Sequence, residues 1–298
     1  MRSVFIFGAG KVGRALARAL RASPGPELSV TLHPARKGLP KQPIDADLLV
    51  LAVRDRDLAP LAHDLAPLVS KRTACVHAAG AQTAEAIAEL RGASAGVAQM
   101  HPMISFASTR VFPTLARGHV HVKGDPVAEK RARAVAKRLG MTPRRFDPLD
   151  TIGYHAAAGL VANGAAALAA VGVELLVKSG VPADVAPKML GPLLRSVAEN
   201  VEALGFPAAL TGPVRRGDAG AVEKHWGVLR ERLPSAFPLY LASVSAQIPL
   251  ARGIGEVPPS ALDAVEAFVA RAQEELRAAP VKFSGPRPDA GDVKERPV

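Results

Sequence analysis

The stretch that decides the fold is residues 4–13, which read Val-Phe-Ile-Phe-Gly-Ala-Gly-Lys-Val-Gly. Its apolar half predicts a buried strand, and the GxGxxG pattern that follows predicts a dinucleotide-binding turn. The first glycine permits a tight turn, the second lets the backbone approach a pyrophosphate, and the third lets helix and strand pack closely. The helix that follows is expected to direct its N-terminus at the anion. The cofactor-binding residues predicted here are Gly8, Ala9, Gly10, Lys11, Val12 and Gly13.

The end of the second expected strand indicates which nicotinamide dinucleotide is bound. An NAD enzyme usually places a carboxylate on the ribose about 20 residues after the glycine motif. In this chain the strand ends at His33, and Arg36 and Lys37 follow where an acidic residue would stand. Two cations suit a 2′-phosphate better than a bare hydroxyl, so the sequence favours NADP as the cofactor. The alternative is that Arg36 and Lys37 are ordinary solvated loop charges.

Further apolar runs, separated by helical stretches, continue the pattern at residues 48–53, 74–77, 97–100 and 119–122. This alternation predicts an α/β Rossmann-like domain with a mostly parallel sheet over residues 1–150. Ligands of such sheets bind at the carboxyl ends of the strands. We therefore expect Val53 and Arg54 after one strand, and Ala79 and Gly80 after the next, to contact the cofactor.

The pattern changes near residue 150, after which helical periodicity continues without a convincing strand. It predicts a smaller all-α domain over residues 151–279 for substrate binding and dimerisation. A disordered tail is expected at 280–298, which is rich in proline, glycine and charge. The expected helices cover residues 152–178, 183–204, 219–233, 235–250 and 259–278. Pro187 and Pro192 predict a kink or a break in the second of them.

The first of these helices is almost wholly apolar over residues 156–177, long enough to span a bilayer. Asn163 and Glu174 interrupt it, and its alanines and glycines offer little area to lipid, so we predict no membrane partner. A helix of small residues packs closely either inside a helical domain or against a symmetry mate. We expect a homodimer, although this pattern alone does not separate the two arrangements.

Charge and composition narrow the class of protein. The chain of 298 residues has a net charge of +11, and residues 1–150 hold this excess with 23 Lys and Arg against 12 Asp and Glu. Such a domain attracts NADP and an anionic small-molecule substrate. Its cations are dispersed, aromatic residues make up 4% of the chain, and no nucleic-acid motif accompanies them, so we predict no nucleic-acid partner.

The single cysteine, the N-terminus and the histidines add three expectations. The single cysteine, Cys75, excludes an internal disulfide, and its apolar neighbours predict a buried core residue and not a nucleophile. The N-terminus starts almost at once with a strand instead of a signal peptide, so a cytoplasmic location is expected. The histidines lack paired ligand spacing with cysteines or carboxylates, so no metal site is predicted.

One set of residues carries a resemblance to a known group: His101-Pro102-Met103 with Phe106, Tyr154-His155, Asn163, Asn200, and residues 210–218 (LTGPVRRGD) with His225. The chain resembles the superfamily of pyrroline-5-carboxylate reductase, deazaflavin-dependent NADP reductase and 6-phosphogluconate dehydrogenase. Within it, the chain is most similar to the family that joins a Rossmann-like domain to a C-terminal helical domain of unknown function. The resemblance implies that fold and cofactor, with no settled substrate.

The His-Pro-Met element at His101 also resembles that of prephenate and arogenate dehydrogenases. Residues 104–106, Ile-Ser-Phe, replace the glycine that those enzymes place soon after it, which argues against a role in aromatic biosynthesis. We predict that His101 binds substrate. The alternative is that it only turns the chain before Pro102.

The long helix supplies the predicted catalytic residues. His155, Gly159 and Asn163 recur at helical spacing and share one face. An imidazole there can exchange the proton that accompanies hydride transfer, and an amide can polarise a carbonyl or imine. We therefore predict His155 for proton transfer and Asn163 for substrate orientation. The alternative is a histidine and an asparagine that serve helix packing alone.

The loop of residues 211–218 is the second candidate site. Arg215 and Arg216 offer forked donors to a carboxylate or phosphate, and we expect Arg216 to hold the substrate. Asp218 either orients His225 or caps the helix that begins after it, and capping is the preferred role. The predicted substrate-binding residues are His101, Thr211, Arg216, Asp218 and His225.

The function predicted from these residues is NADP-dependent hydride transfer to or from a small anionic carbonyl or imine compound. The alternative is a non-catalytic NADP-binding regulatory or scaffold protein, in which the cofactor stabilises a dimer without being consumed.

Overall fold

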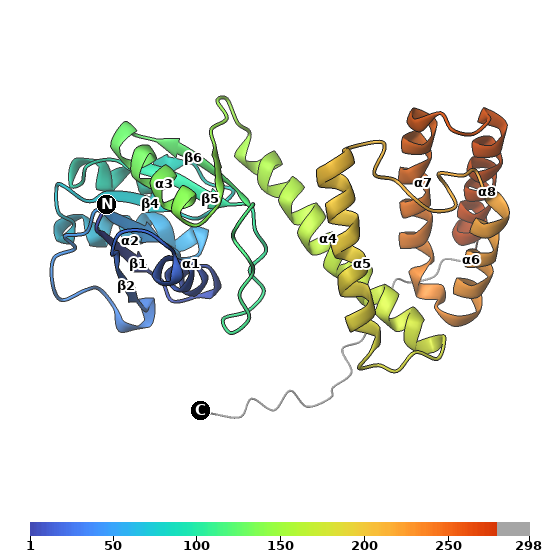
Figure 1. Cartoon of the computed structure of the whole chain (residues 1–298), viewed down its shortest axis with the longest axis horizontal. Coiled ribbons are helices and arrows are strands. Elements are labelled where there is room, and N and C mark those ends of the chain that lie inside the picture. The colour runs from blue at the N-terminus through green and yellow to red at the C-terminus, as the bar shows by residue number, and fades with distance from the viewer. Residues whose placement is uncertain (279–298) are drawn as a thin grey trace. The chain divides into compact units, whose positions relative to one another are not determined.

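The computed structural model describes residues 1–278 and divides the chain into two compact units, Met1–Ala162 and the part that starts at Asn163 (Figure 1). The division falls inside the long helix α4 (Thr151–Lys178). The tail expected at 280–298 lies outside the described residues.

The first unit contains a seven-stranded sheet in the order β2-β1-β3-β4-β5-β6-β7. The strands are β1 (Ser3–Phe7), β2 (Ser29–His33), β3 (Leu48–Leu51), β4 (Ala74–His77), β5 (Val97–Pro102), β6 (His119–Gly124) and β7 (Thr142–Arg144). All neighbouring strands pair in parallel except β5 and β6. The expected Rossmann-like, mostly parallel sheet is therefore confirmed.

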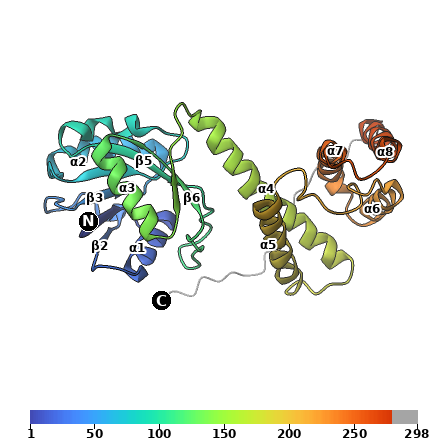
Figure 2. The same ribbon diagram turned by 45° about the horizontal axis from the view of Figure 1, so that its top comes forward.

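Helices and 3-10 turns cover both faces of the central strands (Figure 2). They are α1 (Lys11–Ala22), η1 (Ala35–Lys37), η2 (Asp55–Asp57), α2 (Leu58–Leu65), η3 (Ala66–Leu68), η4 (Ala84–Gly92) and α3 (Pro126–Arg138). Alternate side chains of β3, such as Val50 and Leu51, enter two different cores, one with α1 and α3 and the other with α2 and η4. Burial on both faces explains why these strands read as unbroken apolar runs.

The second unit contains helices joined by turns and loops, with no strand among its described residues. Beyond α4 it contains α5 (Ala186–Leu204), α6 (Ala219–Arg232), η5 (Pro234–Ala236), α7 (Phe237–Ile254) and α8 (Pro259–Ala278). Helices α6, α7 and α8 share a core in which the Trp226 ring stacks on Phe237 at 4.1 Å between centroids and meets Phe268 edge-on. The expected all-α region is therefore confirmed.

Helices α4 and α5 depart from expectation. Pro187 lies in the first turn of α5, where its missing N–H costs nothing, and α5 runs through Pro192 without a break. Helix α4 has no buried residue, so of the two arrangements that the sequence left open, burial inside its own domain does not occur within residues 1–278. Helix α4 is long and apolar enough to cross a membrane. A single helix of this kind is weak evidence for a membrane protein.

Candidate functional site

The glycine turn between β1 and α1 has the geometry that its sequence predicts. Gly8 has a φ of +109°, and a Cβ added there would lie 2.3 Å from the carbonyl oxygen of Ala52 at the end of β3. A Cβ on Gly13 would lie 1.8 Å from the carbonyl oxygen of Gly8, so this glycine lets α1 pack on β1. A Cβ on Gly10 would meet no described atom within 4 Å. The open side of the turn is where a pyrophosphate would approach.

A pocket of about 790 Å³ opens beside this turn, at the carboxyl ends of β1, β3, β4 and β5. We call it the cofactor pocket. Its volume lies within the range of small-molecule and cofactor sites. Of the residues predicted from sequence, those that line it are Gly8, Ala9, Gly10, Lys11, Val12, Val53, Arg54, Ala79, Gly80, His101 and His155.

Other lining residues were not among the predicted site residues: Ala35, Ala52, Asp55, Asp57, Ala78, Pro102, Ile104 and Phe106. Two signals could have found most of them. Asp55 and Asp57 follow the carboxyl end of β3, and the stretch from Pro102 to Phe106 follows that of β5. The rule that selected Arg54 therefore applies to these residues as well.

Four predicted cofactor residues do not line the pocket: Gly13, which is buried in α1, and His33, Arg36 and Lys37. The His33 ring packs against Phe7 at 5.2 Å between centroids, and its Nε2 lies 2.8 Å from the carbonyl oxygen of Gly38, which ties the loop to β2. Arg36 and Lys37 are exposed in η1. Their neighbour Ala35 does line the pocket, so both cations stand at its margin.

Two histidines that line the cofactor pocket converge over Gly80. A Cβ added to Gly80 would lie 2.4 Å from Nδ1 of His155 and 2.7 Å from Nε2 of His101. The two rings meet edge to face, with 5.8 Å between their centroids. A larger residue at position 80 would displace them. The structure thus brings together the predicted proton-transfer residue and a predicted substrate-binding residue.

The surroundings of His101 keep its ring neutral. Burial, followed by the nearby rings of His155, His121 and His77, lowers the pKa of His101 to about 4. Its Nδ1 is buried and has no hydrogen-bond partner among residues 1–278. A neutral imidazole has one donor and one acceptor nitrogen, so His101 is suited to hydrogen bonding and not to charge pairing.

The other predicted residues lie in the second unit. Asn163 is exposed on α4, two turns beyond His155. Asp218 accepts a hydrogen bond from the Ala221 N–H at 2.9 Å, so its preferred capping role is confirmed. Thr211 and Arg216 are both exposed. None of these four residues lines the cofactor pocket, which consists of first-unit residues.

The two neighbours in the predicted loop, Arg215 and Arg216, differ in their contacts. Arg215 donates to the carbonyl oxygens of Ala208 and Leu210 and forms an ion pair with Glu256. Its guanidinium therefore stabilises the conformation of the loop. The Arg216 guanidinium makes no hydrogen bond or ion pair within the described part of the chain. Of the two, Arg216 is therefore the one available to a ligand.

His225 lines a separate, largely apolar cavity of about 400 Å³ within the second unit. Its ring lies edge-on to Tyr240, with 6.4 Å between the centroids, and burial raises the pKa of Tyr240 to about 12. Across residues 1–278, no three His, Cys, Asp or Glu side chains come together in a way that could hold a metal ion.

Comparison with known proteins agrees with this architecture. A family model for a domain of unknown function, DUF2520, matches residues 119–246. No curated protein matches the chain in sequence. Among solved structures, a protein of Thermotoga maritima has 20% identity and a TM-score of 0.62, covering 85% of this chain and 100% of that one.

Two further structures are similar over most of the chain. A Bacteroides fragilis protein assigned as an NADP oxidoreductase has 20% identity and a TM-score of 0.64, covering 83% of this chain and 97% of that one. Pyrroline carboxylate reductase of Plasmodium falciparum, solved with NADP bound, has 13% identity and a TM-score of 0.56, covering 92% and 97%. The chain therefore has the two-part fold that its sequence resemblance implied.

Proposed function

We propose that this protein is an NADP-dependent oxidoreductase that transfers a hydride to or from a small anionic carbonyl or imine compound. The observation that carries the proposal is that one pocket is lined both by the open glycine turn at Gly10 and by the two imidazoles over Gly80. The fold shared with an NADP-bound reductase supports it.

The residues of the pocket fit the parts of the cofactor. The N-terminus of α1 has no acidic residue in its first turn, so its free N–H groups and Lys11 can receive the pyrophosphate. Arg36 and Lys37 are available to a 2′-phosphate at the pocket margin. The nicotinamide, when bound, supplies or accepts the hydride.

The proton that accompanies the hydride is assigned to His155. Its Nδ1 faces the space above Gly80, while His101, held neutral by burial, binds substrate beside it. Asn163 stays a prediction for substrate orientation, and so do Thr211, Arg216 and His225 for substrate binding. Arg216 is the strongest of these because its guanidinium is exposed and makes no side-chain bond to a described residue.

The cofactor choice is tested by titrating the protein with NADPH and NADH and recording nicotinamide fluorescence. We expect NADPH to bind more tightly, and the double variant Arg36→Ala, Lys37→Ala to lose roughly ten- to a hundredfold in NADPH affinity, since hydrogen bonds to a charged group are lost. Affinity for NADH should stay unchanged. Lys130→Ala, which removes an exposed cation of α3 away from the cofactor pocket, is the matched control. Equal NADPH affinity in the double variant would contradict this assignment.

The role of His155 is tested on a substrate found by screening keto acids and cyclic imines with NADPH. We expect His155→Ala to lower turnover by about 10²- to 10⁴-fold while leaving NADPH affinity unchanged, because only proton transfer is removed. His119→Ala, on the exposed start of β6, is the control. Full turnover in His155→Ala would remove its role. NADPH that binds but is never oxidised would favour the scaffold alternative.

We also propose that the protein is a homodimer. In this dimer, α4 and α5 of one subunit pack against α4 and α5 of the other. In the second unit these helices expose Leu168, Met189, Leu193 and Val197, with exposed fractions from 47% to 57%. Met189, Leu193 and Val197 recur at every fourth position of α5 and so share one face, and an exposed apolar face marks an interaction site. The small residues of α4 permit close approach of another helix.

A further inference from the structure

One part of the sheet carries polar side chains where a Rossmann-like sheet is ordinarily apolar. The strand register pairs His77 with Gln99, Gln99 with Lys123, and His101 with His121. These five side chains therefore project from one face of β4, β5 and β6. Four of them, all but Lys123, are buried. Buried polar groups cost free energy unless they are hydrogen-bonded, so this cluster calls for partners.

A second cavity in the first unit lies over this face. It has a volume of about 370 Å³, and we call it the sheet-face pocket. Gln99, His121 and Lys123 line it from the strands, and Thr83 and Thr151 line it from the chain around them. None of these five residues lines the cofactor pocket.

His121 lacks a partner in this cavity. His121 is 1% exposed, and its Nδ1 is buried without a hydrogen bond to any described residue. The ring stacks on Phe146 with 5.7 Å between centroids and 6° between planes, which limits its rotation. Burial, and after it the charge of Lys123, lowers the pKa of His121, so the ring is neutral near pH 7.

Gln99 presents an unused acceptor. Its Nε2 donates to the carbonyl oxygens of Ala79 at 2.9 Å and Gly80 at 3.3 Å. Two carbonyl acceptors fix the orientation of the amide, because only the nitrogen can donate to them. Its Oε1 accepts no hydrogen bond from residues 1–278 and is left for a ligand.

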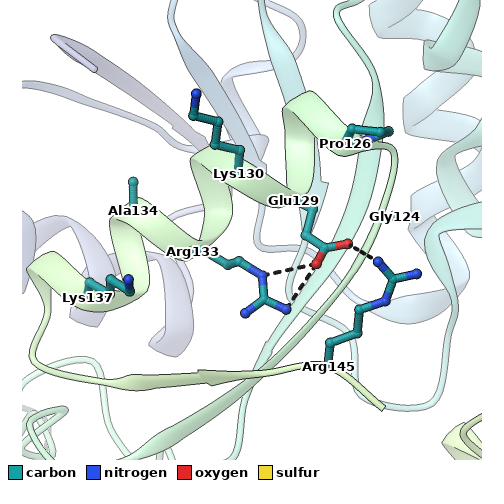
Figure 3. A pocket seen from close by; sticks show the side chains of 8 residues that line it. All are labelled: Gly124, Pro126, Glu129, Lys130, Arg133, Ala134, Lys137 and Arg145. Carbon is teal, nitrogen blue, oxygen red and sulfur yellow. Dashed lines mark hydrogen bonds and ion pairs between the residues drawn. The ribbon is translucent and has the colours of Figure 1, made fainter. Parts of the chain in front are cut away.

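Among the cations of the sheet-face pocket, Lys123 has the ion pair that a ligand can replace most easily. Arg91 is held by both Glu85 and Asp125. Arg145 bonds Asp147 and Glu129, and Figure 3 shows it turned toward Glu129, which also pairs with Arg133. Lys123 has one carboxylate partner, Asp147, at 2.8 Å, and both groups are partly exposed. Such exposed pairs contribute little stability, so a ligand can replace the partner.

We propose that the sheet-face pocket binds a small carboxylate that also carries a hydroxyl or amino group. The carboxylate pairs with Lys123, and the hydroxyl or amino group donates to Oε1 of Gln99, beside the ring of His121 that lines the same pocket. The site is separate from the cofactor pocket, and its occupancy does not depend on the proposed reaction.

The test is a titration of the full chain, labelled with ¹⁵N in its histidines, with L-lactate and L-alanine as probes and propionate as the ligand without a donor. Ring spectra report on each imidazole. We expect a saturable shift of the His121 ring nitrogens with lactate or alanine, and binding of propionate weaker by about tenfold, because one hydrogen bond is missing. The absence of any His121 shift with both probes at tens of millimolar would overturn the proposal.

Two variants locate the site. Lys123→Met, at a partly exposed position, should weaken lactate binding by about tenfold or more, because the carboxylate loses its cation. Lys130→Met, on the outer side of α3, is the matched control and should leave it unchanged (Figure 3). Gln99→Leu should abolish the preference for lactate over propionate, and this ratio can be read even if the variant is less stable. Unchanged binding in Lys123→Met would place the ligand elsewhere.

Discussion

A single buried histidine gives the first unit a dependence on pH. The pKa of His101 is lowered to about 4, so the folded chain takes up its proton later than the unfolded chain as the pH falls. The contribution of His101 to the free energy of unfolding is therefore fully present above the unfolded pKa near 6.5, and it is lost as the pH falls toward 4. We predict that the free energy of unfolding drops by about 1.5 kcal/mol between pH 6.5 and pH 5 through this residue. Urea unfolding of wild type and His101→Gln at both pH values measures it.

The control for this prediction is His63→Gln. His63 is exposed and its pKa is raised by the Glu89 hydrogen bond, so its contribution has the opposite sign. His77 and His121 also have lowered pKa values, so a smaller fall with pH should remain in the His101 variant. An equal fall in the variant and in wild type would contradict the assignment to His101.

At the scale of elements, two glycines of the motif between β1 and α1 have different roles: Gly13 is needed for folding, and Gly10 for cofactor binding. A methyl group at Gly13 would collide with the Gly8 carbonyl, whereas one at Gly10 would enter open space. We predict that Gly13→Ala lowers the free energy of unfolding by roughly 3 kcal/mol or more through overpacking, and that Gly10→Ala changes it by less than about 1 kcal/mol. Gly10→Ala should instead weaken NADPH binding. Thermal unfolding and cofactor titration of both variants provide the two measurements, and equal stability losses would contradict the assigned roles.

Elements were predictable from the sequence where the signal is local. The glycine turn, the central strands and the helices of the second unit follow from apolar periodicity and turn residues that stand close together in the chain. The strand β7 was missed because its three residues are partly exposed and carry no apolar run. The sheet-face pocket was missed because it depends on the antiparallel register that sets His121 beside His101. No local pattern encodes that pairing.

At the scale of the whole molecule, the apolar faces of α4 and α5 determine the expected assembly. We predict that the wild-type protein sediments as a dimer at micromolar concentration, and that Leu193→Glu yields a monomer, because a buried unpaired charge opposes association. Val111→Glu, at a residue that is 76% exposed in the first unit, is the control and should remain dimeric. A wild-type monomer would contradict the proposal. Co-sedimentation with lipid vesicles would assign the helices to a membrane instead.

The lone cysteine makes the protein a convenient background for chemical labelling. Cys75 lies fully buried on β4, and burial raises the pKa of its thiol to about 12, so almost none of it is thiolate near neutral pH. A maleimide should therefore leave the native chain unmodified. A cysteine introduced at Val111, which is 76% exposed and does not line the cofactor pocket, would then be the sole reactive thiol, with no native residue to remove first. A spin label or fluorophore at that position would leave the proposed cofactor-binding cations and the exposed apolar side chains of α5 unaltered.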